Sequence, residues 1–441
     1  MDIYEQITKM ADEIAPELVA QRRDFHKFAE KGWFEMRTSS IIARKLTEMG
    51  YEVLVGDQVC KKDARMGVPS DEELEEQYER AVAQGADPEF VKYTKGGMTG
   101  VIGILRCGEG PTVAMRFDID ALGVFEEKDK SHRPACEGFG SVNEGFMHAC
   151  GHDTHNAMLL GAVKVILKMR DEFAGTVRFL FQPGEETCEG APAMIKQGAL
   201  DGADYAFGIH ISSTLPCGHI AAMPGASHAA TDRYWITING KTAHGADPKN
   251  GVDAAVAGAA TVMALQTLVS REYDPADPLV VTVGQIHSGS RFNIIPGKCE
   301  IEGTVRTYSR EIHDEIQDTL TRIAKNTAAA FRCTADVKYD KIAEVNYNDE
   351  EAYAIGVKAA EEVAPGKVEM GTPTMGGEDF SFYTSHTKCA FFSLGARWPD
   401  VSKIYSMHHE SVLFDESALE TGVAFYAQVA IDALDKMNSE K

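Results

Sequence analysis

Apolar residues repeat at helical spacing at the start of the chain and then form short runs that alternate with helical stretches. Residues 3–30 fit an amphipathic helix. Further along, compact apolar runs typical of buried strands are separated by an apolar helical stretch. This alternation predicts an α/β fold, with a mostly parallel sheet covered by helices on both faces and functional groups at the carboxyl ends of the strands. We expect the strands at Thr112–Phe117, Thr176–Phe181 and Tyr205–Ile209, and the helix at Thr154–Phe173.

A different pattern begins near Arg233 and ends near Glu344. A strand, an Ala-rich helix, two strands, a helix and a strand follow one another, which is the split βαβ order of a small α+β domain. We therefore predict a catalytic domain of residues 1–228 and 342–441, interrupted by an inserted domain of residues 229–341. The inserted elements are expected at Arg233–Asn239, Val252–Leu268, Leu279–Ile286, Lys298–Tyr308, Glu311–Phe331 and Thr334–Tyr339.

A highly charged segment, residues 57–100, precedes the first buried strand of the catalytic domain. Its stretch Ser70-Asp71-Glu72-Glu73 has the signature of a helix start, and the segment closes with Gly96-Gly97. We interpret it as a surface insertion that contains one helix.

The composition narrows the classes of partner. The 441 residues suffice for two domains, and a hydrophobic content of 44% suffices for full cores. A formal net charge of −23 disfavours nucleic acid and anionic lipid. No apolar run approaches the roughly 20 residues that span a bilayer, and the first residues lack the basic and apolar regions of an export signal. Nine cysteines at irregular spacings then predict a cytoplasmic chain with unpaired thiols.

The densest group of metal-binding side chains runs from Met147 to His155, just before the predicted helix. It combines three histidines with Cys150 and Asp153. Thiolate and imidazole suit zinc and related ions, and Asp153 could orient a ligand histidine. The structural alternative is a helix start capped by Asp153 or Thr154, with incidental histidines. The density of ligand types favours the metal site.

The adjacent pair Glu185-Glu186 is a second candidate, because it follows the apolar run Val177–Phe181. Adjacent carboxylates at the end of a strand can divide two tasks, ligating a metal and accepting a proton. Such pairs are usually solvated surface features, and the buried strand before them is what favours a catalytic role. Lone side chains that are weaker candidates, because each commonly serves structure, are Asp118, His210, His408 and His409.

Taken together, the motifs resemble the aminoacylase and carboxypeptidase superfamily of dinuclear metallohydrolases. Within it, they resemble the amidohydrolase branch that acts on N-acyl and indole-3-acetyl amino acids. The order of the motifs carries the resemblance, above all Cys-Gly-His-Asp followed at this distance by Glu-Glu. The motifs cover nearly the whole chain, at residues 116–122, 148–153, 182–186, 242–244, 293–296 and 376–380 and at His408.

The resemblance implies a centre of two divalent ions, Mn²⁺ or Zn²⁺, with Glu185 as the general base. Relatives often have His-x-Pro near the end of the chain, where this sequence has Glu410 in place of the proline. His408 and His409 therefore stay open as alternatives at that position. The ligands that the resemblance implies are Cys150, His152, Glu186, His210 and His408.

The resemblance also assigns residues of the inserted domain to the substrate. It implies that His244 reaches a neighbouring active site across a dimer and polarises the substrate carbonyl. Asn293 and Arg306 would hold the substrate carboxylate, and Arg291 is a further basic candidate for an additional carboxylate. The dimer would form through the inserted domain.

Within this branch, the chain is similar to the A-type subunits that hydrolyse p-aminobenzoyl-glutamate, a product of folate breakdown, to p-aminobenzoate and glutamate. The similarity implies a small N-acyl amino acid as substrate, and either a homodimer or a heteromer with a homologous B-type subunit. The matching stretches are residues 22–26, 65–69, 96–100 and 131–134, two of which lie in the insertion.

Three other interpretations remain open. A general N-acyl or N-acetyl amino acid amidohydrolase, or a small-peptide carboxypeptidase, would use the same centre. A non-catalytic metal-binding subunit of a hydrolase complex belongs to another class, although every expected ligand position is filled here. A Cys150 nucleophile working with His152 or His155 is disfavoured, because it gives no purpose to the Glu185-Glu186 pair.

Overall fold

The computed structural model describes residues 2–188 and 190–440 and divides into two compact units. Unit 1 contains the residues up to Gly225, together with Tyr347–Thr372 and the chain from Phe382 onwards. Unit 2 contains Ala226–Asn346 and Pro373–Ser381. The segment Pro373–Ser381, which the sequence pattern places in the catalytic domain, is therefore grouped with unit 2.

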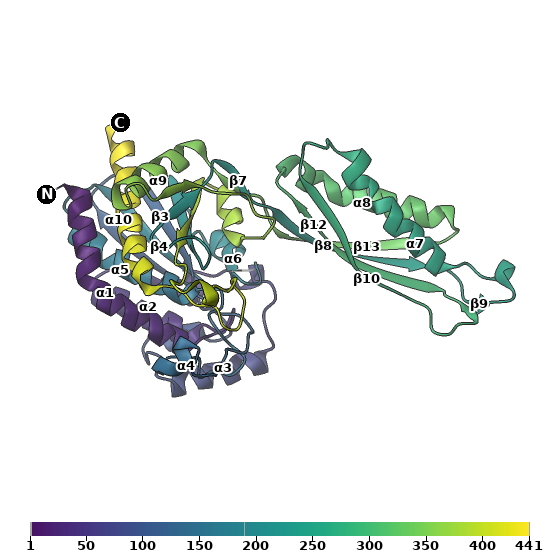
Figure 1. Cartoon of the computed structure of the whole chain (residues 1–441), viewed down its shortest axis with the longest axis horizontal. Coiled ribbons are helices and arrows are strands. Elements are labelled where there is room, and N and C mark those ends of the chain that lie inside the picture. The colour runs from purple at the N-terminus through teal and green to yellow at the C-terminus, as the bar shows by residue number, and fades with distance from the viewer. Residues whose placement is uncertain (1, 189, 441) are drawn as a thin grey trace. The chain divides into compact units, whose positions relative to one another are not determined.

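Unit 1 is built on a mixed sheet whose centre is parallel (Figure 1). The predicted mostly parallel α/β fold is confirmed, with antiparallel strands added at the flanks, where β2 pairs with β1 and β4 and where β16 pairs with β6. The four central strands β4, β3, β5 and β16 run parallel to one another. In spatial order the strands are β1 (Glu52–Val55), β2 (Val101–Cys107), β4 (Gly175–Gln182), β3 (Thr112–Asp118), β5 (Tyr205–Ser212), β16 (Lys388–Gly395), β6 (Ile220–Ala222) and β15 (Val368–Met370).

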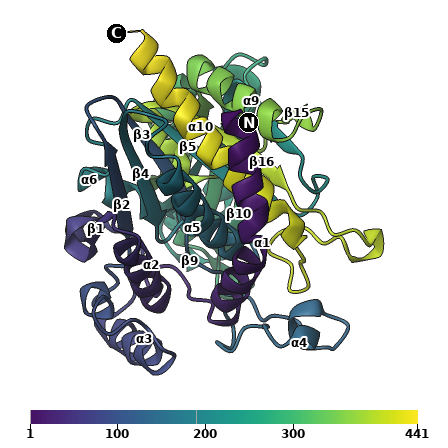
Figure 2. The same ribbon diagram turned by 90° about the vertical axis from the view of Figure 1, so that its left-hand side faces the viewer.

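Helices α1 (Ile3–Lys27), α5 (His152–Lys168) and α10 (Leu419–Ser439) contact one another and cover one face of this sheet (Figure 2). Helix α9 (Glu350–Val363) packs against α10 and β16. Almost every residue of α5 is buried, because the helix lies between the sheet and the other helices. Strands β3 and β4 are buried on both faces, as expected for a parallel sheet with both faces covered.

The predicted insertion carries one α-helix, α3 (Asp71–Ala83), and short 3-10 turns. The helix begins at the capping box that the sequence suggests, with the Ser70 hydroxyl accepting a hydrogen bond from the Glu73 amide. Leu74 and Ala81 are buried, and the helix packs against α2 (Met36–Glu48). The insertion is thus part of the packed structure rather than a detached surface loop.

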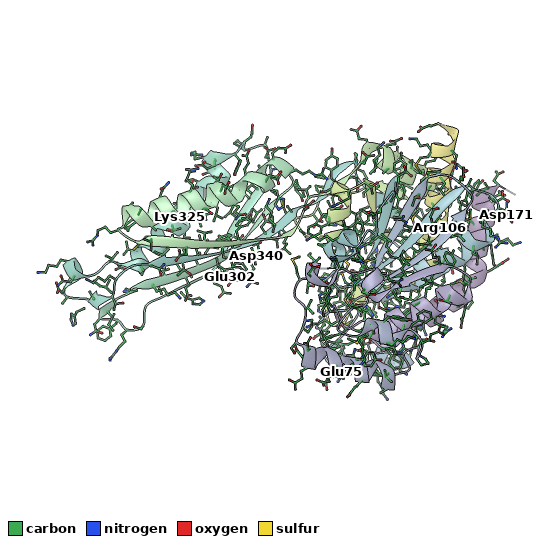
Figure 3. The ribbon with its side chains drawn as sticks, turned by 180° about the vertical axis from the view of Figure 1, so that it is seen from behind. Glu75, Arg106, Asp171, Glu302, Lys325 and Asp340 are labelled. Carbon is green, nitrogen blue, oxygen red and sulfur yellow. The ribbon has the colours of Figure 1, made fainter. Side chains whose placement is uncertain are left out.

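Unit 2 is a four-stranded antiparallel sheet with α7 (Ala254–Leu265) and α8 (Arg310–Ala330) on one face. The strands also carry an exposed ion pair between Arg233 and Glu302. Figure 3 labels Glu302 and Asp340 on the strands and Lys325 on α8. Beyond the sheet, two short strands, β9 (Ala243–His244) and β11 (Ile294–Ile295), pair as a ribbon. The strands of the sheet, in spatial order, are β10 (Leu279–Ser288), β12 (Lys298–Thr307), β8 (Ala230–Asn239) and β13 (Thr334–Ala343).

Among the described residues, one helical stretch, Ala254–Glu272, is long and apolar enough to cross a membrane by length and composition alone. Its inward side packs into the core of unit 2, where Leu265 and Leu268 are fully buried. Its outward side is also apolar, with Val256 51% exposed and Met263 71% exposed. Apolar side chains on both sides of this helix explain its high hydropathy.

Candidate active site

Three of the predicted motifs meet at one edge of the unit 1 sheet, because the strands that precede them are parallel neighbours. Asp118 ends β3, and the loop with Glu185 and Glu186 follows β4. His210 lies inside β5 rather than after it, since pairing with β16 extends that strand to Ser212. Helix α5 begins at His152, two residues earlier than the sequence pattern predicts.

The Cys150 thiol lies between side chains that are far away in the sequence. Its Sγ atom is 3.4 Å from Nε2 of His210 and 3.3 Å from Nε2 of His408. Nε2 of His408 is also 3.6 Å from Oε2 of Glu186. Sulfur, imidazole and carboxylate atoms thus surround one point, as the donors of a soft-to-borderline metal site would.

His152 and the two glutamates complete the cluster. Nε2 of His152 lies 3.7 Å from Oε1 of Glu186 and 3.9 Å from Oε2 of Glu185. Within the part of the chain that the structure describes, Nε2 of His152 and Oε1 of Glu186 are buried and have no hydrogen-bond partner. Buried polar atoms are costly to leave unpaired, so these two atoms fit the ligand positions of a cation.

The charge balance of the cluster also fits a cation. Burial raises the pKa of Glu186 to about 8. His152 lowers this pKa, whereas the nearby Asp120 and Asp118 carboxylates raise it. Burial, with Glu186 and Glu185 nearby, raises the pKa of the Cys150 thiol well above its usual range. Burial alone would lower the pKa of His152, yet the surrounding acids raise it to about 10. Burial and the crowding of acidic groups thus keep protons on Glu186, Cys150 and His152 when no cation is there to take their place.

Backbone carbonyls set the tautomers of two of the histidines. Nδ1–H of His152 donates to the carbonyl oxygen of Asp120 at 2.9 Å, and Nδ1–H of His210 donates to the carbonyl oxygen of Ile211 at 2.6 Å. A carbonyl only accepts, so Nδ1 carries the proton in both rings. In the neutral ring Nε2 is left with its lone pair facing the cluster, which is the form that binds a metal.

His155, the last histidine of the dense motif, is placed differently. Its Nδ1 contacts Oδ1 of Asp118, and its Nε2 accepts a hydrogen bond from the amide of Ile211 at 2.9 Å. Because both ring nitrogens are engaged, His155 holds β5 against Asp118 and is not available as a metal ligand. Nothing in the sequence separates its role from that of His152, since both histidines belong to the same motif.

Asp118 is surrounded by three basic side chains. Although burial by itself raises the pKa of a carboxyl group, His152, His155 and Arg116 bring the pKa of Asp118 well below its usual range. Nη1 of Arg116 lies 2.9 Å from Oδ2 of Asp118. Asp118 is therefore a fixed anion behind His152, where it can orient that ring.

The structure distinguishes the two C-terminal histidines by position. His408 is in a left-handed backbone conformation, with φ of 69°, and its amide donates to the carbonyl oxygen of Ala149 at 2.9 Å. This turn brings its ring to Cys150. The ring of His409 instead stacks on Tyr405 at 4.4 Å, and its Nδ1 accepts from the amide of Ser411. Of the two alternatives, His408 faces the cluster.

The predicted substrate-binding residues all lie in unit 2. His244 is on β9 and is exposed, and the amide of Gly245 donates to the carbonyl oxygen of Asn293 at 2.8 Å, so His244 and Asn293 share one ribbon. Arg291 precedes this ribbon in an exposed loop. Arg306 lies near the other end of β12, paired with Thr231 where the chain enters the unit. Strand β12 rises about 3.3 Å per residue, so Arg306 lies roughly 25 Å from the ribbon along this strand.

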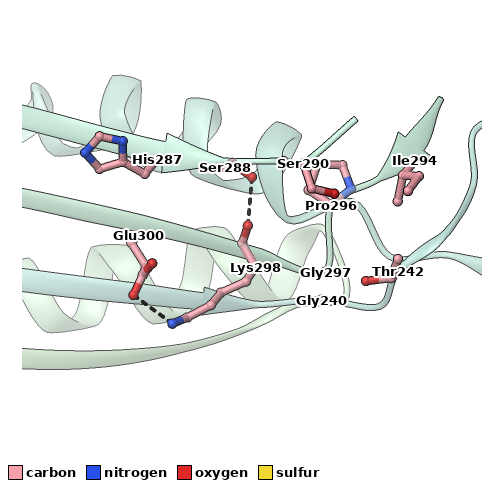
Figure 4. Close-up of a pocket in the computed structure, with 11 residues that line it drawn as sticks. Gly240, Thr242, His287, Ser288, Ser290, Ile294, Pro296, Gly297, Lys298 and Glu300 are labelled. Carbon is pink, nitrogen blue, oxygen red and sulfur yellow. Dashed lines mark hydrogen bonds and ion pairs between the residues drawn. The ribbon is translucent and has the colours of Figure 1, made fainter. Parts of the chain in front are cut away.

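A hollow of about 500 Å³ lies beside the same ribbon (Figure 4). Its lining mixes polar and apolar residues, and Nζ of Lys298 donates to the carboxylate of Glu300 on the same strand at 2.7 Å. Among the described residues that line it there is one histidine, His287, and none of the thiol or paired carboxyl groups found in unit 1. The hollow therefore lacks the set of metal-binding donors that the Cys150 cluster gathers.

Comparisons with known proteins agree with this geometry. A family model described as peptidase family M20/M25/M40 matches residues 114–432. The thermostable carboxypeptidase 1 of Saccharolobus solfataricus is 31% identical over 440 residues, with 99% of this chain and all of that protein covered. The A-type subunit of the p-aminobenzoyl-glutamate hydrolase of Escherichia coli is 35% identical over 329 residues, or 74% of each chain. A solved structure, the Bacillus subtilis YXEP protein described as a dinuclear metal binding peptidase, has a TM-score of 0.76 at 28% identity and covers 96% of this chain and 99% of its own.

Proposed function

We propose, from the premise that this chain belongs to peptidase family M20/M25/M40 and is a metal-dependent hydrolase of amide bonds, that it cleaves small N-acyl amino acids, with p-aminobenzoyl-glutamate as the preferred substrate. The single observation that carries the proposal is the meeting of Cys150, His152, Glu186, His210 and His408 beside Glu185. The substrate is supported by the relative from Escherichia coli and by the two matching stretches within the insertion.

The five clustered side chains would hold two divalent ions. Thiolate and imidazole ligands favour Zn²⁺ over Mg²⁺, and the family resemblance implies Mn²⁺ as the other candidate. When bound, such ions polarise an amide carbonyl and lower the pKa of water toward neutrality. Glu186 lies within 4 Å of both His152 and His408, so it would hold metal together with these two histidines.

Glu185 would act as the general base. Its carboxylate lies at the edge of the cluster, where it can take a proton from the attacking water and pass it to the departing amine nitrogen. His244 would donate a hydrogen bond to the developing oxyanion, an effect worth about 3–4 kcal/mol per donor. Glu185 would thus protonate the nitrogen of the amide, while His244 would stabilise the negative charge on its oxygen.

The substrate carboxylate would be bound by residues of two protomers. Asn293 and Arg306 are separated by roughly 25 Å along the strand within one unit 2, so one chain cannot place both on a single carboxylate. A homodimer resolves this distance if Arg306 comes from one protomer while the ribbon with Asn293 and His244 comes from its partner. Arg291, in the same exposed loop, would receive a second carboxylate such as that of glutamate.

The apolar outward side of α7 and the edge strand β10 supply a surface for that dimer. Met263 is 71% exposed on the helix, and Ile286 is 47% exposed on the strand. Exposed apolar side chains next to an unpaired strand edge favour association with a second copy. A B-type subunit related to this chain could occupy the same surface. We place the reaction in the cytoplasm, because the irregular spacing of the nine cysteines is typical of thiols rather than of a disulfide framework.

A substrate panel tests the proposed function. The purified chain, stripped of metal and reloaded with Mn²⁺ or Zn²⁺, should show its highest kcat/KM on p-aminobenzoyl-glutamate. Higher values on N-acetyl amino acids or on dipeptides would move the assignment to a general amidohydrolase or to a carboxypeptidase. Absence of turnover on every substrate, with metal bound, would leave the chain as a metal-binding subunit.

Metal loading should release protons. At pH 7 the metal-free protein holds protons on His152, with its pKa near 10, on Glu186, with its pKa near 8, and on the Cys150 thiol. Ligands must lose these protons, so we expect about two to three protons to be released per site at pH 7 and apparent affinity to increase as the pH rises. Titration calorimetry in two buffers of different ionisation enthalpy measures this number. Loading without proton release would contradict these ligand assignments.

A further inference from the structure

The loop that carries Glu185 is held from two sides by buried carboxyl groups. The amide of Gly184 donates to Oε1 of Glu35 at 2.9 Å, and the amide of Glu186 donates to Oδ2 of Asp120 at 3.0 Å. Glu35 and Asp120 are both 0% exposed and come from different segments of the chain. The peptide N–H groups of the two residues that flank Glu185 are therefore each fixed by an acceptor outside the loop.

The turn that contributes Glu35 lies directly against the same loop. A Cβ atom on Gly32 would lie 3.2 Å from Cα of Gly184 and 3.5 Å from Oδ2 of Asp120, so glycine is what allows this close approach. A Cβ atom on Gly184 would lie 3.5 Å from the indole of Trp33, and Trp33 itself is held in a left-handed conformation with φ of 66°. Close backbone packing and local strain of this kind accompany positions whose geometry matters for function.

Glu35 also connects the loop to the insertion. The hydroxyl of Thr99 donates to Oε2 of Glu35 at 2.7 Å, and the indole N–H of Trp33 donates to the carbonyl oxygen of Met66 at 2.9 Å. Thr99 and Met66 both belong to residues 57–100. The insertion thus contacts the catalytic loop through the Trp33–Glu35 turn, although its helix carries none of the implied metal ligands.

We propose that Glu35 is a positioning residue for hydrolysis, which acts with Asp120 as a two-point clamp on the peptide groups on either side of Glu185. The proposal rests on the proposed function in that Glu185 is taken as the general base. A carboxylate that must reach one water molecule loses efficiency when it is displaced by about 1 Å, and the clamp restricts such displacement. The insertion would stabilise the clamp through Thr99.

The clamp depends on an acceptor atom rather than on a charge. Burial raises the pKa of Glu35 well above its usual range, and the Asp120 carboxylate adds to the rise. A neutral carboxyl group still accepts a hydrogen bond through its carbonyl oxygen, and so does a glutamine amide. Glu35→Gln should therefore preserve the clamp, whereas Glu35→Leu should remove it.

Glu30, which lies a short distance before Glu35 in the chain, offers a matched control. Its carboxyl group is also 0% exposed, but the hydrogen bonds that it accepts come from the amides of Arg37 and Thr38 at the start of α2 and from the Arg80 side chain, all of them outside the Glu185 loop. Glu30→Leu should lower thermal stability to a similar degree as Glu35→Leu, because each change leaves buried N–H groups unpaired. Only Glu35→Leu should alter the geometry around Glu185.

Two measurements test the clamp. In Mn²⁺-loaded protein, Glu35→Leu should lower kcat about 10-fold to 100-fold with KM within about threefold, while Glu35→Gln and Glu30→Leu keep kcat within about threefold. In metal-free protein, hydrogen exchange of the peptide covering residues 183–188 should accelerate in Glu35→Leu and not in Glu30→Leu. Equal kcat losses in the two leucine variants, or no rescue by Glu35→Gln, would overturn the proposal.

A further variant and the metal-free measurement separate misfolding of Glu35→Leu, failure of the clamp and failure of the proposed function from one another. If Glu35→Leu does not fold, Glu35→Asp retains the carboxyl group but shortens the side chain by one methylene, so the acceptor no longer reaches Gly184. Unchanged kcat and unchanged exchange in Glu35→Asp would equally overturn the clamp. If the loaded wild-type chain turns over no substrate of the panel, the proposed function fails, and the exchange comparison in metal-free protein still decides whether Glu35 holds the loop.

Discussion

Glu185→Gln should bind metal as the wild-type chain does and lose turnover by about 10³-fold to 10⁴-fold. The amide keeps the size of the side chain but cannot accept a proton at neutral pH, so the water loses its base and the leaving amine loses its acid. Glu185 lies 3.9 Å from Nε2 of His152, farther than the contacts that join the five ligands to one another. Metal analysis and steady-state kinetics on the same sample separate binding from catalysis.

Glu186→Gln is the informative comparison, because the neighbouring side chain is assigned the other role. Glu186 has Oε1 near His152 and Oε2 near His408, so loss of its charge should lower metal content together with activity. Excess metal should then restore part of the activity of Glu186→Gln and none of the activity of Glu185→Gln. Wild-type turnover by Glu185→Gln would remove this residue from the role of base.

The sequence predicts the centre of the fold well, because its signal is local. Strand-and-helix alternation places β3, β4 and β5, and parallel neighbours necessarily present their carboxyl ends at one edge. The flanking strands β6 and β15 are three residues each and carry too short a pattern to be recognised. The sheet is therefore more mixed at its edges than the sequence indicates.

For the candidate site too, the sequence predicts some features and leaves others to the tertiary structure. The motifs identify which residues belong to the site, but not which ring nitrogen or carboxyl oxygen faces inward. His155 shares the motif of His152 and yet uses both nitrogens on Asp118 and Ile211. Glu35 is a lone carboxyl group between Phe34 and Met36, and its proposed role follows from a contact with Gly184, 149 residues away. Such long-range pairings are set by tertiary packing and leave no periodic trace in the sequence.

Because Arg306 lies far from the ribbon with His244, we expect two inactive variants to regain activity when they are mixed. His244→Ala should lose about 10²-fold to 10³-fold in kcat, because one donor to the oxyanion is removed. If His244 serves the neighbouring protomer, then in a hybrid dimer of His244→Ala with Glu185→Gln one site has both defects and the other site has neither. Half of the dimers in an equal mixture are hybrids, so about a quarter of wild-type activity should return.

The two variants should be co-expressed with different tags, so that hybrids can be isolated by sequential affinity steps. Each homodimer, purified in the same way, provides the baseline. Because His244 and Glu185 would act on the same bond from different chains, the recovered activity should have the wild-type KM and half the wild-type kcat per dimer. Isolated hybrids with no activity above the two homodimers would place His244 in the active site of its own chain, and the distance between Asn293 and Arg306 would then need another explanation.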